Sequence, residues 1–331
     1  MAVRRCVGIA SAKVRRLINS RRPRVVINAV MPWMLFEVPP GVRLVSLSDV
    51  VTSIVNTGHS DFIRRAPRYK RQATRLERPM VERISAGALP ASVVRHAAVV
   101  NGLDASRHHV VFVNTNIVSD LLSVPSASAP GTAPVLIVVS DPVRMQTDLA
   151  VEACARLYRL GSSVRAELIG LVTTPARIMS RFRCQGRLRL NDAADRRTHS
   201  DAISRANLLL LPSLAEGAPL AFREAAHFGV PAVINDAGGL RDVVLDRETG
   251  RVLPVGSNAV DYARVMAGVL GDPEDNWVTT RSADSRAQRV FTWRVWPQII
   301  LEFAGVASAT ACLGDFGRKP FMILNDGATS H

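Results

Sequence analysis

The sequence has few cysteines, few aromatic residues and no long apolar run. The four cysteines among its 331 residues, Cys6, Cys154, Cys184 and Cys312, lie too far apart for a disulfide framework or a zinc site and favour a reducing compartment. Aromatic residues make up only 5%, so the core must consist mainly of aliphatic side chains. No apolar stretch reaches the roughly 18 residues that span a bilayer. We therefore predict a cytoplasmic protein without a metal site.

Acidic residues are scarce as well. The 42 Lys and Arg residues outnumber the 28 Asp and Glu residues, which gives a net charge of +14. This excess favours anionic partners, although a high-GC genome explains the arginine content equally well. The basic residues 1–24 fit two interpretations, a helix lying on the inner face of an anionic membrane and a solvated helix. No nucleic-acid-binding motif is present, so we expect no specific nucleic-acid partner.

The chain changes character near residue 131, after a stretch rich in Ser, Pro, Ala and Gly. We predict two domains, residues 1–131 and 132–305, followed by a tail over 306–331. The first domain has strand patterns at 22–30, 42–51 and 110–117, and we expect His108 and His109 at its surface. In the second, strand patterns at 135–140, 164–170, 206–211 and 230–236 alternate with helical ones. That alternation predicts a doubly wound parallel α/β sheet, and Cys154 falls among its core residues.

The chemistry is concentrated in residues 206–254. Glu216 follows a buried strand, and Gly217, Ala218 and Pro219 let a ligand approach the backbone closely. The helix that begins next offers free N–H groups to an anion. Glu224 lies two turns into that helix, where a carboxylate must be paired or must face a polar ligand.

A second turn of small residues, Gly238-Gly239, follows the next strand at the same sheet edge. Together these segments form an anion cradle with two carboxylates that can accept hydrogen bonds from hydroxyl groups. Ribose and hexose are the natural ligands of such a site.

The segment EGAPLAFRE, residues 216–224, resembles the E-x7-E signature of retaining glycosyltransferases with the GT-B fold, in the family 4 (group 1) class. The flanking sequences LLLLPS, EAAHFGVPAVINDAGG and TGRVLP resemble the same family. VLIVVSDPVRMQTDLAVEACARL resembles the first strand and helix of its nucleotide-binding domain. FTWRVWPQIILEF, residues 291–303, resembles its closing helix. The first half resembles the later part of the acceptor domain.

The resemblance implies a GT-B-like fold of two Rossmann-like domains, of which the N-terminal one is incomplete because its usual first strand and Gly-rich loop are not apparent. It implies transfer of a hexose from a nucleotide diphosphate sugar to an acceptor hydroxyl, with retention and without a metal or other cofactor. Glu224 would hold the ribose hydroxyls, and Glu216 would contact the donor sugar near its reacting end. The backbone around Ala218, Pro219 and Leu220 would hold the diphosphate or the sugar.

One departure from the family concerns the phosphate-binding cations. Arg144 matches the expected arginine, but Met145 stands where a lysine is expected. A missing cation lowers the stabilisation of the leaving diphosphate. The alternative is therefore a catalytically inactive homologue that acts as a nucleotide-binding or interaction module. The sequence is compatible with three classes of acceptor: a glycan, a lipid and a small molecule.

Overall fold

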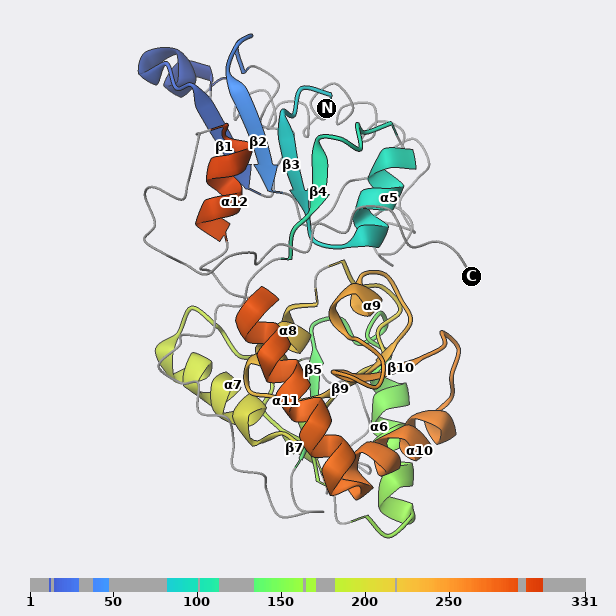
Figure 1. The fold of residues 1–331 in the computed structure, drawn as a ribbon. Coiled ribbons are helices and arrows are strands. Elements are labelled where there is room, and N and C mark those ends of the chain that lie inside the picture. The colour runs from blue at the N-terminus through green and yellow to red at the C-terminus, as the bar shows by residue number, and fades with distance from the viewer. Residues whose placement is uncertain are drawn as a thin grey trace. The chain divides into compact units, whose positions relative to one another are not determined.

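The protein is described by a computed structural model of the chain. The structure describes residue 12 and residues 15–29, 38–47, 82–100, 102–112, 134–162, 165–170, 182–217, 219–290 and 296–305. Contacts divide the chain into two compact units, Met1–Val113 with Trp293–His331, and Asn114–Thr292. Each unit has its own parallel sheet with helices packed on it (Figure 1). The predicted domain boundary at residue 131 lies outside the described residues.

The first unit contains a four-stranded parallel sheet in the order β1-β2-β3-β4. Its strands are β1 (Val25–Ala29), β2 (Arg43–Leu47), β3 (Ala86–Leu89) and β4 (His108–Val110), and helix α5 (Ser92–Val100) connects the last two. The first two fall inside the predicted strands. The third predicted strand, 110–117, overlaps β4 only at Val110, and most of it lies outside the described residues. The sequence did not predict β3, whose AGAL segment carries little β-branched character.

Helix α12 (Trp296–Phe303) packs on this first sheet (Figure 1). Ile299 and Phe303 join a buried cluster that includes Val45 of β2, and the Nε atom of Arg43 donates a hydrogen bond to the Phe303 carbonyl oxygen at 2.6 Å. The sequence assigned this segment to the second domain. Its contacts lie with the first sheet instead, because the apolar face of a helix does not specify which sheet it covers.

His108 is buried in β4, so the expectation that it lies at the surface is wrong. Its side chain is only 3% exposed, and its Nδ1 atom lies 2.9 Å from the carbonyl oxygen of Asp104. Burial lowers the pKa of His108, which favours the neutral ring. β4 is the last strand of this sheet, and the ring of His108 packs against Gly87 of the neighbouring β3, which has no side chain to keep the ring away from the sheet.

The second unit contains a six-stranded parallel sheet in the order β10-β9-β8-β5-β6-β7. The strands are β5 (Val135–Val139), β6 (Ala166–Gly170), β7 (Phe182–Cys184), β8 (Leu208–Leu211), β9 (Ala232–Asn235) and β10 (Gly250–Leu253). The four predicted strands of this unit are confirmed, and so is the doubly wound α/β fold. Every residue of β8 and β9 is buried, which explains their unbroken apolar runs.

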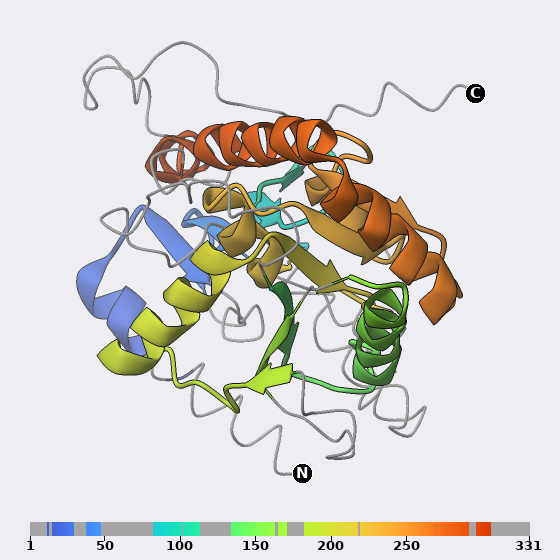
Figure 2. The same ribbon diagram turned by 90° about the horizontal axis from the view of Figure 1, so that it is seen from below.

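Helices cover both faces of this sheet. They are α6 (Thr147–Arg159), α7 (Ala193–Arg205), α8 (Leu220–His227), α9 (Leu240–Val243), α10 (Ala259–Gly271) and α11 (Pro273–Val290). Helix α6 packs with α10, whereas α8 packs with α7 and α11; α6 and α7 lie on opposite sides of the sheet (Figure 2). Cys154 of α6 is a core residue, as predicted, and burial raises its thiol pKa to about 12.

The sheet has its topological switch point between β5 and β8. These two strands are neighbours, yet the chain leads from β5 to β6 on one side and from β8 to β9 on the other. Ligands of doubly wound folds bind at the carboxyl ends of the strands at such a point. None of the helices in the described part of the chain is both long and apolar enough to cross a membrane.

We predict that Phe303→Ala lowers the free energy of unfolding by about 3–5 kcal/mol, because it leaves a cavity where the ring packs against the first sheet. Urea denaturation measures this change. Glu302→Ala, an exposed change on the same helix, should stay within about 0.5 kcal/mol of the unchanged protein. Equal effects of the two substitutions would contradict the packing of α12 described above.

Candidate functional site

Glu216 lies at the carboxyl end of β8, beside the switch point. Ser213, which is fully buried, donates its hydroxyl to Glu216 Oε1 at 3.0 Å. Arg144, which follows β5, donates from Nη1 to the same Oε1 atom at 2.5 Å and to the carbonyl oxygen of Ala215 at 2.7 Å. The side chains of Arg144 and Glu216 are 10% and 13% exposed. The charge-assisted contact therefore ties the loops after two neighbouring strands together.

The hydrogen bonds described above from Arg144 to Ala215 and Glu216 both come from one guanidinium nitrogen, Nη1. The Nη2 atom of Arg144 donates to the Ser140 hydroxyl at 3.1 Å. Its Nε atom is buried, makes no hydrogen bond to any described residue, and lies 4.0 Å from Asp141 Oδ2. A buried donor without an acceptor is costly.

Met145 turns inward at the same strand end. The residue is 7% exposed, and its sulfur accepts a hydrogen bond from the Ser140 backbone N–H at 3.1 Å. A buried thioether thus fills the position at which the resemblance to group 1 glycosyltransferases leads us to expect a lysine.

The Gly238-Gly239 turn contacts the backbone of Glu216, as expected for two loops at one sheet edge. The Gly239 N–H donates to the Glu216 carbonyl oxygen at 2.6 Å. Gly238 has a φ of +58°, and a Cβ atom placed on it would lie 2.2 Å from that same oxygen. Only glycine fits this position, because the turn needs both a left-handed backbone and a close approach.

Helix α8 begins at Leu220, directly after this loop. Pro219 precedes it without a side-chain cap, so the N–H groups of the first turn have no acceptor within the helix. Such a helix start attracts anions. Gly217 is half-buried in the preceding loop, and Ala218 lies outside the described residues.

Glu224 is buried in the second turn of α8 and is paired with a histidine. Its Oε2 atom lies 2.9 Å from Nε2 of His199 on α7. The sequence predicted that this carboxylate is paired or faces a polar ligand, but it did not identify the histidine. The available signal was the spacing of His199, Ala202 and Ile203, which places the histidine on the buried face of α7. The hydrogen bonds described for Glu216 and Glu224 involve different residues.

Asn235 is a second residue that the sequence reasoning missed. It ends β9, is 1% exposed, and donates from Nδ2 to the Pro212 carbonyl oxygen at 3.0 Å and to Gln146 Oε1 at 3.1 Å. The Tyr262 hydroxyl donates to its Oδ1 atom, and burial raises the pKa of that hydroxyl, which keeps it protonated. Asn235 thereby fixes the loops after β5 and β8. The signal in the sequence was an amide side chain at the end of a strand whose other residues are apolar.

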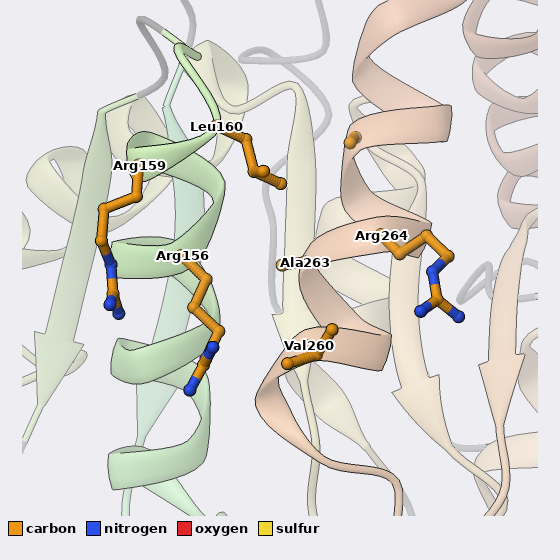
Figure 3. Close-up of a pocket in the computed structure, with 7 residues that line it drawn as sticks. Arg156, Arg159, Leu160, Val260, Ala263 and Arg264 are labelled. Carbon is orange, nitrogen blue, oxygen red and sulfur yellow. The ribbon is translucent and has the colours of Figure 1, made fainter.

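A separate groove of about 410 Å³ runs between α6 and α10 (Figure 3). Its walls are aliphatic side chains and three arginines: Leu160, Val260, Ala263, Ala267, Arg156, Arg159 and Arg264. Arg156 and Arg159 both pair with Glu152, at 2.9 and 3.0 Å. None of the lining residues carries a carboxylate, so this groove offers no charged acceptor to sugar hydroxyls. Nowhere in the described residues do three or more His, Cys, Asp or Glu side chains gather as a metal site would require.

We predict that Gly238→Ala destabilises the protein more than Gly256→Ala does. Both glycines have positive φ, but a Cβ atom on Gly256 meets no neighbour. Gly256→Ala should therefore lower the free energy of unfolding only by the cost of a left-handed backbone at alanine, about 1–2 kcal/mol. Gly238→Ala should add the displacement of the Glu216 backbone. Thermal unfolding compares the two, and equal losses would contradict the close contact.

Comparison with known proteins agrees with this geometry. Residues 129–285 match the family model described as "Glycosyl transferases group 1". A D-inositol 3-phosphate glycosyltransferase from Arthrobacter sp. (strain FB24) is 34% identical over 97 residues, which are 29% of this chain and 23% of that protein. The enzyme of that name from Kribbella flavida is 31% identical over 105 residues, 32% of this chain and 24% of its own. The matched stretch thus spans about a quarter of these relatives.

Solved structures share the fold over most of the chain. Anabaena HepE in complex with UDP superposes with a TM-score of 0.68 at 17% identity, covering 89% of this chain and 81% of HepE. Sucrose-phosphate synthase from Thermosynechococcus elongatus gives a TM-score of 0.67 at 16% identity, covering 90% and 78% of the two chains. The fold is that of GT-B glycosyltransferases, and the segment from residue 129 to residue 285 is a domain of the glycosyl transferases group 1 family.

Proposed function

We propose that this protein transfers a hexose from a nucleotide diphosphate sugar to an acceptor hydroxyl, with retention of configuration and without a metal or other cofactor. The observation that carries the proposal is the Arg144–Glu216 contact at the switch point between β5 and β8. It brings a cation and a carboxylate together where doubly wound sheets bind ligands. The structures of HepE, described as complexes with UDP and with UDP-glucose, support a nucleotide-sugar donor.

Arg144 and the start of α8 would bind the diphosphate. The Arg144 guanidinium and the N-terminal end of α8, where the helix dipole is positive, are both suited to phosphate oxygens. Negative charge develops on the diphosphate as the bond between the sugar C1 atom and oxygen breaks. Fixed donors at that position lower the barrier because they need no rearrangement during the reaction.

The two carboxylates would bind the two sugars of the donor. Both described hydrogen bonds to Glu216 end on Oε1, which leaves Oε2 for a hydroxyl of the transferred hexose. His199 holds Oε2 of Glu224, which leaves Oε1 for the ribose hydroxyls. Gly217, Ala218, Pro219, Leu220, Gly238 and Gly239 would supply the close backbone of the cradle.

The acceptor would be a hydroxyl compound, and the net charge of +14 suits one that carries phosphate or lies on an anionic membrane. The curated relatives are named D-inositol 3-phosphate glycosyltransferases, a name that contains a phosphorylated hydroxyl compound. The alternative, an inactive homologue that acts as a nucleotide-binding or interaction module, draws support from the buried Met145 at the expected lysine position.

Calorimetric titration with UDP, GDP and ADP tests the donor site. We expect one of them to bind in the micromolar range, and Glu224→Gln to weaken it by about 10- to 100-fold, because hydrogen bonds to a charged group are lost. Glu248→Gln changes an exposed carboxylate of the same unit and should leave the affinity unchanged. If Glu224→Gln and the unchanged protein bind the nucleotide with equal affinity, Glu224 does not contact the nucleotide.

Release of nucleoside diphosphate from the corresponding nucleotide sugars tests catalysis. Arg144→Gln should slow this release by about 10²–10³-fold, because it removes charge stabilisation from the leaving group. Arg264→Gln, on the rim of the α6–α10 groove, is the matched control and should retain full activity. Nucleotide binding without turnover of any sugar nucleotide or acceptor would favour the inactive homologue.

A further inference from the structure

The His199–Glu224 pair is buried and joins two helices. The two side chains are 8% and 5% exposed, and Nε2 lies 2.9 Å from Oε2. A carboxylate buried to this degree is costly unless a donor compensates it. His199 supplies that donor from α7, next to Ala202 and Ile203 on the buried face of the helix.

The geometry fixes which atoms are engaged. A carboxylate is an acceptor only, so the proton of the ring that faces Glu224 must be on Nε2. The other ring nitrogen, Nδ1, is buried and makes no hydrogen bond to any described residue. The Nε2 contact is therefore the one polar interaction described for this ring, and it determines the rotation of the carboxylate.

We propose that His199 is a positioning residue that sets the selectivity of the site for ribose over deoxyribose. It holds Oε2 of Glu224 and so directs Oε1 toward the neighbouring 2′- and 3′-hydroxyls of the nucleoside. This inference rests on the proposed role of Glu224 as the ribose ligand. A carboxylate fixed in this way discriminates strongly against a ligand that lacks the hydroxyls, because its own acceptor then stays unpaired in a buried site.

The test compares two polar replacements that differ in reach. The amide nitrogen of Gln extends about as far as Nε2, whereas that of Asn extends only about as far as Nδ1. His199→Gln should therefore retain the hydrogen bond to Glu224, and His199→Asn should lose it. Ile203→Ala, one turn along the same buried face, is the control for general loosening of α7.

The measurement is calorimetric titration of the full chain with UDP, GDP and ADP and with the 2′,3′-dideoxy form of each. For the nucleotide that binds, the unchanged protein should prefer the ribose form by about tenfold or more. His199→Asn should bring this ratio below about threefold while the dideoxy affinity stays nearly constant. His199→Gln should restore most of the preference, and Ile203→Ala should lower the melting temperature without changing the ratio.

Three results would overturn the inference. An unchanged ratio in folded His199→Asn would show that the ring only packs. If His199→Asn weakens the ribose form and the dideoxy form equally, the substitution has damaged the binding site as a whole. If the unchanged protein binds none of the nucleotides, the proposed function fails and this inference fails with it; the first two results, by contrast, leave the proposed function intact.

Discussion

The contact between Arg144 and Glu216 depends on the order of the strands. The two residues are 72 positions apart in the sequence, and they meet because β5 and β8 pair in parallel and end at the same edge. Next to this contact, Ser213 donates a hydrogen bond to the Glu216 carboxylate, and the Gly238-Gly239 turn holds the Glu216 backbone. Asn235 holds the loops that follow both strands. Any change in strand order would separate all of these groups.

The site is held by polar contacts in surroundings that exclude most water. Glu216 and Glu224 each have one oxygen held by a protein donor and a second oxygen with no described partner. A carboxylate arranged in this way is already oriented before a ligand arrives, so less entropy is lost on binding. The same arrangement appears twice, with an arginine at one carboxylate and a histidine at the other.

The sequence predicted the strands of the second unit well, because Val135–Val139, Leu208–Leu211 and Ala232–Asn235 are short apolar runs followed by small or polar residues. It also predicted that Glu216 and the Gly238-Gly239 turn lie at one sheet edge, since parallel topology requires it, whereas Arg144 was a candidate only through the resemblance to the family. It did not identify His199 or Asn235, because the partner of a buried polar group depends on tertiary packing. The burial of His108 and the attachment of α12 to the first sheet were missed for the same reason.

The return of α12 to the first sheet affects how the protein is made. The cluster around Val45 contains Ile299 and Phe303, so this core cannot close until the segment that carries Phe303 has been synthesised. The sheet of the second unit needs nothing beyond Leu253. During translation the second unit can therefore fold while the first still exposes the apolar face of its strands. The nascent chain should depend on chaperones mainly through its N-terminal unit.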